Sequence, residues 1–194
     1  MNLPNTLTFM RVLLTFAVAA LLFAGAKYFA TAAFAVYLAA GASDWFDGYI
    51  ARKYNIVTTV GKFMDALSDK IMIVTMFMTL FALNLYQNWT AAALVCAVIS
   101  MAREFYISGF RMIAAQKGEV IAAETIGKYK AAFQMYSVGA IICASALRAD
   151  FGDASSPLYV FAFYTGIATL GISTALSIIS AVSYSVKYSR LLKQ

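Results

Sequence analysis

Four aspartates in the first third of the chain stand at spacings that helices would bring together. Asp44 and Asp47 are three positions apart, and Asp65 and Asp69 are four positions apart. Because residues three or four positions apart share one face of a helix, two facing helices would pool four carboxylates. Clustered carboxylates repel one another and need cations to neutralise them. Oxygen ligands favour hard ions, so the pattern predicts a site for Mg²⁺ or Mn²⁺.

The residues around these aspartates suit a phosphorylated substrate. Gly48 and Gly61 have no side chain, so a nucleotide or a facing helix could approach the backbone closely. Arg52 supplies a planar cation that matches phosphate oxygens. Two ions held by four carboxylates could clamp a phosphoryl group. Taken singly, Asp44 or Asp47 is equally well explained as the solvated end of a helix.

A second set of charges lies later in the chain. Arg103, Glu104 and Arg111 interrupt an apolar segment, and Lys128 and Lys130 open the next one. Charges at membrane depth are costly and usually line a cavity or pair with one another. The four cations could therefore bind a doubly charged phosphate. Two alternatives stay open: Arg103 and Glu104 could form an internal ion pair, and the lysines could extend to lipid headgroups.

The composition indicates an integral membrane protein. Of 194 residues, 62% are hydrophobic and 12% are charged, which is too apolar for an ordinary soluble domain. Apolar runs long enough to cross a bilayer, at about 20 residues each, occur six times. They cover residues 7–26, 28–50, 62–86, 89–113, 128–147 and 158–184. We therefore expect an all-α fold with six transmembrane helices, in one domain over residues 1–194.

Positive charge predicts the orientation of these helices. Placing both termini and the second and fourth connections on one side collects all of the 15 Lys and Arg residues except Lys27 and Arg148. By the positive-inside rule, both termini and the aspartates face the cytoplasm, so we expect a multi-pass protein of the inner (cytoplasmic) membrane. Residues 1–10 mix polar and apolar side chains. They could form a short interfacial segment or a plain helix start.

Eight identities stand at the spacing D-x2-D-G-x2-A-R-x8-G-x3-D-x3-D. They are Asp44, Asp47, Gly48, Ala51, Arg52, Gly61, Asp65 and Asp69. This pattern resembles the signature of the CDP-alcohol phosphotransferase family and is highly specific. The segments 4–11, 43–55, 61–70, 103–111 and 127–135 are also similar to those of the subgroup that acts on glycerol 3-phosphate. One departure is that this subgroup usually has Asp-Pro-x-Ala-Asp where residues 65–69 read Asp-Ala-Leu-Ser-Asp.

The resemblance implies a six-helix membrane enzyme of phospholipid biosynthesis, commonly a homodimer. Such an enzyme transfers a phosphatidyl group from CDP-diacylglycerol to an alcohol and releases CMP. The resemblance also implies that two divalent cations, Mg²⁺ or Mn²⁺, are bound and that Asp69 is the general base. The implied metal ligands are Asp44, Asp47, Asp65 and Asp69, and the implied contacts to CDP-diacylglycerol are Asn5, Thr8, Gly48, Arg52 and Thr58.

The expected acceptor is glycerol 3-phosphate. Four cations favour a phosphorylated alcohol over serine, choline or free inositol, and they are Arg103, Arg111, Lys128 and Lys130. The expected partners are thus both substrates, membrane lipids and a second copy of the chain, with no nucleic acid. Inositol phosphate and phosphatidylglycerol stay open as other acceptors. A cation-coupled transporter is a further alternative, because intramembrane carboxylates also mark ion pathways, but it leaves the eight-residue signature unexplained.

Overall fold

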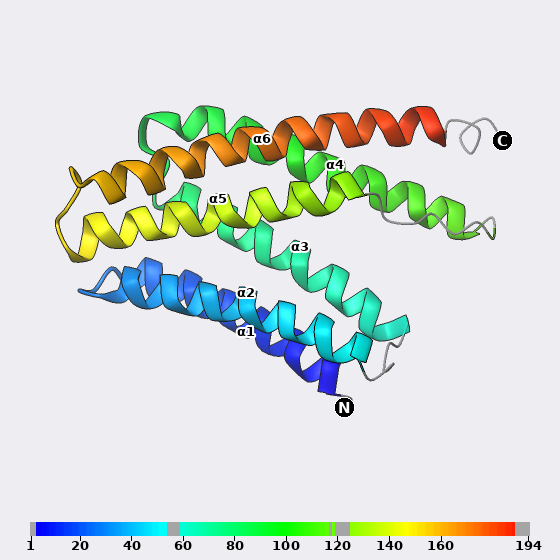
Figure 1. The fold of residues 1–194 in the computed structure, drawn as a ribbon, viewed down its shortest axis with the longest axis horizontal. Coiled ribbons are helices and arrows are strands. Elements are labelled where there is room, and N and C mark those ends of the chain that lie inside the picture. The colour runs from blue at the N-terminus through cyan, green and yellow to red at the C-terminus, as the bar shows by residue number, and fades with distance from the viewer. Residues whose placement is uncertain (1–2, 54–58, 117, 119–124, 189–194) are drawn as a thin grey trace. The chain divides into compact units, whose positions relative to one another are not determined.

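The structure is a computed structural model that describes residues 3–53, 59–116, 118 and 125–188. Within these ranges, only the backbone is described for residues 3–8, 44–53, 59–60, 62–63 and 65. The described chain is helical, with six α-helices and one short 3₁₀ helix (Figure 1). The elements are α1 (Leu3–Ala24), α2 (Phe29–Lys53), α3 (Thr59–Ala82), η1 (Gln87–Trp89), α4 (Thr90–Gln116), α5 (Thr125–Asp150) and α6 (Pro157–Lys187).

Each of the six apolar runs in the sequence forms one of these helices, as predicted. One difference is at the end of the third run, which was expected to reach residue 86 but leaves the α-helix at Ala82. Asn84 has a φ of 49° and Gln87 a φ of 51°. Residues in this left-handed region do not continue a right-handed helix, and asparagine tolerates the region better than most residues. The chain therefore turns here and forms η1 before α4.

The first helix includes most of the segment that could have been a separate interfacial element. Helix α1 is continuous from Leu3 to Ala24. Pro4 lies in its first turn, where the missing N–H of proline has no intrahelical acceptor to lose. The backbone therefore forms a plain helix start in this segment. The placement of the first turns of α1 at the membrane interface stays a prediction.

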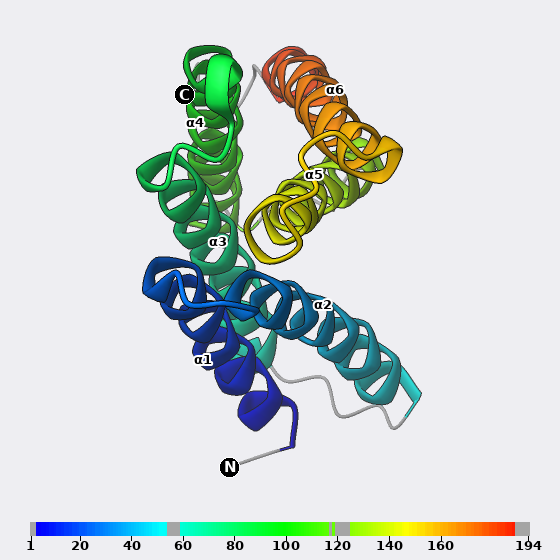
Figure 2. The ribbon, with the colours of Figure 1, turned by 90° about the vertical axis from the view of Figure 1, so that its left-hand side faces the viewer.

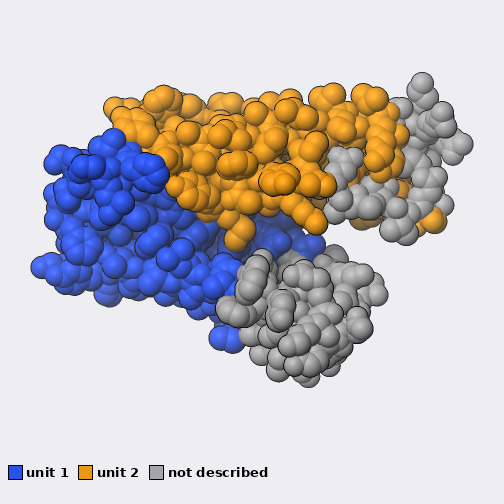
Figure 3. All heavy atoms as spheres, viewed as in Figure 1, with its two compact units in different colours: residues 1–85, 138–163 blue, residues 86–137, 164–194 orange. Residues whose placement is uncertain are grey.

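The chain divides into two compact units, coloured separately in Figure 3. Unit 1 comprises residues 1–85 and 138–163, and unit 2 comprises residues 86–137 and 164–194. Helices α5 and α6 each contribute residues to both units. The prediction of a single domain stays a prediction.

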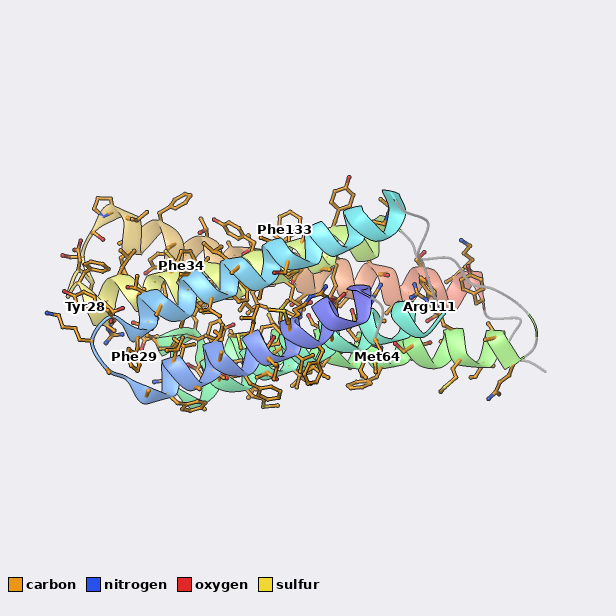
Figure 4. All side chains as sticks on the ribbon, turned by 90° about the horizontal axis from the view of Figure 1, so that it is seen from below. Tyr28, Phe29, Phe34, Met64, Arg111 and Phe133 are labelled. Atoms are coloured by element: carbon orange, nitrogen blue, oxygen red, sulfur yellow. The ribbon has the colours of Figure 1, made fainter. Side chains whose placement is uncertain are left out.

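In unit 1, α1 packs against both α2 and α3, and α1 and α2 lie side by side from the loop that joins them (Figures 1 and 2). Tyr28 and Phe29 lie at that loop (Figure 4). The carboxylate of Asp150, at the end of α5, accepts hydrogen bonds from the backbone N–H groups of Tyr28 (2.9 Å) and Thr31 (2.7 Å) and from the Thr31 hydroxyl (2.6 Å). It therefore caps the N-terminal end of α2.

In unit 2, α4 and the adjoining parts of α5 and α6 are joined by polar contacts. The Ser137 hydroxyl of α5 donates to the backbone oxygen of Gly166 in α6 (2.6 Å). The Thr174 hydroxyl of α6 is 3.4 Å from the backbone oxygen of Cys96 in α4 and 2.9 Å from an oxygen of its own helix. Hydroxyls that bond backbone oxygens satisfy their own polarity inside an apolar bundle.

Three helical segments in the described part of the chain are long and apolar enough to cross a membrane. They are Gln87–Gln116, Thr125–Asp150 and Pro157–Lys187, and shorter apolar stretches cover Phe9–Ala24 and Phe29–Ser43. Large apolar side chains point outward from them, such as Phe161 and Val186 of α6. Outward-facing apolar surface of this extent suits lipid and not water. The chain is thus a multi-pass membrane protein, while the number and direction of its spans stay predictions.

Candidate active site

Two consecutive helices of unit 1, both packed against α1, carry the four aspartates of the signature. Asp44 and Asp47 lie in the last turns of α2, and Asp65 and Asp69 lie in the first half of α3. The prediction that both pairs are helical is therefore confirmed. Helix α1, which packs on α2 and α3, carries Asn5 and Thr8.

Several predicted site residues lie outside the described part of the chain. Thr58 falls in the range 54–58, for which no structure is described. Only the backbone is described for Asn5, Thr8, Asp44, Asp47, Gly48, Arg52 and Asp65. Their convergence on two cations and on the CDP group therefore stays a prediction.

Asp69 is the one signature aspartate whose side chain is described. It accepts a hydrogen bond from Nη1 of Arg11 at 2.8 Å, and its side chain is 56% exposed. Nη1 of Arg11 also donates to the hydroxyl of Ser68 at 3.1 Å. The Arg11 side chain is 1% exposed. Asp69 is thus held from its buried side while its carboxylate stays accessible from outside.

The donor set carried by α2 and α3 fits hard divalent cations. Its side chains offer carboxylate oxygens, which are the ligands that Mg²⁺ and Mn²⁺ prefer. The accessible carboxylate of Asp69 fits a ligand of such an ion. Among the side chains that the structure describes, no cluster of three potential metal ligands is found. The side chains of Asp44, Asp47 and Asp65 are not among those described.

In unit 2, Glu104 joins two of the predicted cations. Oε1 of Glu104 accepts hydrogen bonds from Nζ of Lys130 at 2.6 Å and from Nη1 of Arg103 at 3.1 Å. Nη2 of Arg103 also donates to the hydroxyl of Ser180 on α6 at 2.6 Å. The internal ion pair left open by the sequence is therefore present. Two cations and one carboxylate still leave this cluster with one net positive charge.

The first turn of α5 lies close to the Arg103 guanidinium of α4. A Cβ atom added at Gly127 would lie 3.4 Å from Nη2 of Arg103, which is at the limit of ordinary van der Waals contact. This turn is followed directly by Lys130, which reaches Glu104 of α4.

The other two predicted cations have different surroundings. Arg111 is exposed, two turns beyond Arg103 on α4, and its Nη2 donates to the hydroxyl of Tyr184 at 3.1 Å (Figure 4). Its guanidinium carbon lies 6.0 Å from the centre of the Tyr184 ring, at the limit for a cation–π contact. Lys128 is exposed on α5. The structure thus brings Arg103 and Lys130 together, and it places Arg111 on Tyr184.

One turn further into the bundle, unit 2 buries two polar groups without partners. Ser100 precedes Glu104 by four residues on α4, and Gln134 follows Lys130 by four residues on α5, so the two lie at similar depth on antiparallel helices (Figure 1). Both side chains are buried. In the described part of the chain, Oγ of Ser100 and Nε2 of Gln134 have no hydrogen-bond partner. A buried unpaired polar group costs about 1–3 kcal/mol, so these two groups lower the stability of this part of the bundle.

Sequence reasoning missed Arg11, Ser180 and Tyr184 as residues of these sites. Arg11 is a cation inside the first apolar run, three positions after Thr8, and this is the signal that could have marked it. Ser180 and Tyr184 look like ordinary members of a long apolar helix, so no local signal marks them.

A family comparison identifies the class of protein. The model of the family described as CDP-alcohol phosphatidyltransferase matches residues 1–182. The chain belongs to this family. The match confirms the resemblance carried by the eight-residue signature, and CDP-alcohol phosphatidyltransferases depend on divalent metal ions.

Individual relatives narrow the comparison. The CDP-diacylglycerol–glycerol-3-phosphate 3-phosphatidyltransferase of Bacillus subtilis is 36% identical over 135 residues, which cover 69% of this chain and 67% of the relative. The enzyme of that name from Rickettsia typhi is 30% identical over 183 residues, which cover 94% of each chain. Cardiolipin synthase (CMP-forming) from Oryza sativa is 32% identical over 200 residues, which cover 99% of this chain and 59% of the relative.

Proposed function

We propose that this CDP-alcohol phosphatidyltransferase transfers the phosphatidyl group of CDP-diacylglycerol to glycerol 3-phosphate, giving phosphatidylglycerophosphate and CMP in phospholipid biosynthesis. The observation that carries the proposal is the similarity to the Rickettsia typhi enzyme, which extends over 94% of both chains. The Bacillus subtilis enzyme, with the same printed activity, supports it. The signature on α2 and α3 supplies the residue types that this chemistry needs.

In the proposed reaction, a hydroxyl of glycerol 3-phosphate attacks the phosphorus of the phosphatidyl group. A new phosphorus–oxygen bond forms, the bond to the CMP phosphate breaks, and CMP leaves with the bonding electrons. The hydroxyl proton passes to the carboxylate of Asp69. Asp69 suits this role because its carboxylate is accessible and is fixed by Arg11.

The four aspartates would hold the divalent cations of the proposed reaction. When bound, two such ions neutralise the diphosphate and stabilise the charge on the leaving CMP. Asn5, Thr8, Gly48, Arg52 and Thr58 are proposed to bind the CDP group. Among the four proposed metal ligands, only the side chain of Asp69 is described by the structure. The accessibility of this carboxylate supports its assignment as a ligand.

Arg103 and Lys130 are proposed to bind the phosphate of the acceptor, together with Arg111 and Lys128. The net positive charge of the cluster on Glu104 supports this assignment, because a phosphate monoester carries up to two negative charges. We also propose that both termini and this chemistry face the cytoplasm at the inner membrane, and that two copies form a homodimer.

A second candidate is transfer to phosphatidylglycerol, which would make cardiolipin. The similarity to the rice cardiolipin synthase over 99% of this chain favours it. Phosphatidylglycerol carries its charge in a phosphodiester, with one negative charge where glycerol 3-phosphate has up to two. The cationic cluster of unit 2 therefore fits glycerol 3-phosphate better.

An acceptor panel tests these proposals. Purified protein in mixed micelles receives CDP-diacylglycerol, Mg²⁺ or Mn²⁺, and one acceptor from glycerol 3-phosphate, phosphatidylglycerol and inositol phosphate. CMP release and the lipid product are measured. Phosphatidylglycerophosphate formed with glycerol 3-phosphate supports the first proposal. Product formed only with phosphatidylglycerol supports the second, and no CMP release with any acceptor overturns both.

A further inference from the structure

We propose that Arg11 is a positioning residue for Asp69, and that Ser68 assists it by fixing the guanidinium of Arg11. This inference deepens the proposed function and rests on it, because it assumes that Asp69 is the base. Its basis is the contact that joins α1 to α3 inside unit 1. Nη1 of Arg11 is 2.8 Å from Oδ1 of Asp69 and 3.1 Å from Oγ of Ser68.

The geometry binds one guanidinium nitrogen to two consecutive residues of α3. Each terminal nitrogen of arginine carries two hydrogens in a fixed plane, so one can point to the carboxylate and one to the hydroxyl. Ser68 is buried and Asp69 is 56% exposed. The guanidinium therefore approaches the carboxylate from the protein side and leaves its outer side to substrate.

Packing explains why Arg11 can hold this position. Its side chain is 1% exposed, and a buried guanidinium keeps its place only where acceptors compensate its lost hydration. The arginine thus has little freedom to rotate, and neither does the carboxylate bonded to it.

The difference in exposure between the two partners argues for more than a link between helices. An ion pair that serves packing alone does not need either charge to face outward, and its Coulombic attraction is weaker where water screens it. Here the arginine is buried and the carboxylate is accessible, which is the arrangement needed to aim a carboxylate at a substrate. Holding a reacting group in place avoids entropy loss in the transition state, and a displacement of 1 Å can cost about 100-fold in rate.

The position of Arg11 also connects the base to the proposed nucleotide contacts. Asn5 and Thr8 stand six and three positions before it on α1. Because α1 packs against both α2 and α3, one helix would bear residues for the CDP group and the residue that orients Asp69.

Steady-state kinetics of purified variants test the inference. The variants are Arg11→Met, Arg11→Lys and Ser68→Ala. Thr15→Val and Thr79→Val are matched controls, because these buried hydroxyls lie on the same two helices and bond backbone oxygens of their own helix. Both substrates are varied, and thermal unfolding of the metal-free protein is recorded for each variant.

We expect Arg11→Met to lower kcat by about 10-fold to 100-fold and to leave the KM for CDP-diacylglycerol within about 3-fold of its original value. Arg11→Lys should recover part of this loss, since an ammonium can reach the carboxylate but lacks the fork. Ser68→Ala should lower kcat by a smaller factor, and both controls should keep it. A folded Arg11→Met protein with unchanged kcat overturns the inference. If Arg11→Met does not fold, unchanged kcat in both Arg11→Lys and Ser68→Ala overturns it equally.

A double-mutant cycle separates this inference from the proposed function. If Arg11 acts through Asp69, adding Arg11→Met to Asp69→Asn should not lower the residual kcat further. Losses that multiply show that Arg11 acts independently, and they overturn the inference. In contrast, near-normal turnover by Asp69→Asn alone removes Asp69 as the base and contradicts the proposed mechanism. The same cycle measured by thermal unfolding tests the contact without any turnover. If Arg11 and Asp69 are bonded, the change in Tm of the double variant should differ from the sum of the two single changes.

Discussion

Replacement of Glu104 by glutamine removes the charge that holds Arg103 and Lys130 together. Glutamine keeps the size of the side chain and one acceptor oxygen, so the change isolates the charge. Lys130 is almost fully buried, and its ammonium is 2.6 Å from Oε1 of Glu104. In the variant, that ammonium keeps its burial and loses its counter-charge.

The size of the effect follows from the exposure of the partners. Breaking a fully buried ion pair costs about 3–5 kcal/mol, but the Glu104 side chain is 28% exposed, and water reaches part of the pair. We therefore expect a loss of about 2 kcal/mol in the free energy of unfolding. For a chain of 150–250 residues, this corresponds to a fall in Tm of about 4–8 °C. If the cluster binds the acceptor phosphate, the KM for glycerol 3-phosphate should fall by about 10-fold, because the substitution raises the net charge of the cluster from one to two positive charges. The KM for CDP-diacylglycerol should not change.

The assay combines thermal unfolding in detergent with kinetics in which both substrates are varied. Asp150→Asn is the matched control, because that carboxylate also accepts several short hydrogen bonds but lies at the N-terminal end of α2. It should lower Tm and leave the KM for glycerol 3-phosphate unchanged. A Glu104→Gln protein that loses stability like the control but keeps its acceptor KM would falsify the role of the cluster in acceptor binding. An unchanged Tm would refute the electrostatic reasoning itself.

Three further predictions concern the metal, the membrane orientation and the packing of unit 1. Excess EDTA should abolish CMP release and added Mg²⁺ or Mn²⁺ should restore it; full activity in EDTA would contradict the metal assignment. In a protein whose native cysteines are replaced, an impermeant thiol reagent should label Lys187→Cys only from the cytoplasmic side and Ser155→Cys only from outside, and the reverse pattern would refute the orientation. Gly139→Ala should lower stability by about 1–3 kcal/mol, because its Cβ would lie 3.0 Å from the Tyr37 ring. Gly171→Ala, which meets no atom within 4 Å, should leave Tm unchanged or slightly raised.

The sequence predicts the helices well because a membrane imposes a local rule on them. Each span needs about 20 apolar residues, and such runs can be read without knowing what they contact. The end of α3 could not be placed, since it depends on the left-handed backbone of Asn84. Asparagine is compatible with several conformations, and its neighbours in space select one of them.

The candidate site was predictable where its residues repeat along one helix. Asp65 and Asp69 are four positions apart, so their spacing is visible in the sequence. Arg11 and Asp69 are 58 positions apart, and their contact depends on how α1 packs on α3. The pair of Arg103 and Glu104 could be foreseen because the two are adjacent. The second partner of Glu104 is Lys130, which lies on the next helix. A contact that depends on how two helices pack cannot be recognised from the spacing of residues in the sequence.

The cap that Asp150 places on α2 has a consequence for the order in which the chain is made. The backbone N–H of Thr31 precedes its acceptor by 119 positions, so a ribosome making about 5–20 residues per second completes that pair about 6–24 s after Thr31. Helix α2 is therefore synthesised before its cap exists, and α3 and α4 are synthesised in the interval. A nascent chain arrested before Asp150 has no carboxylate for these amides, so the arrival of the fifth helix completes the end of the second.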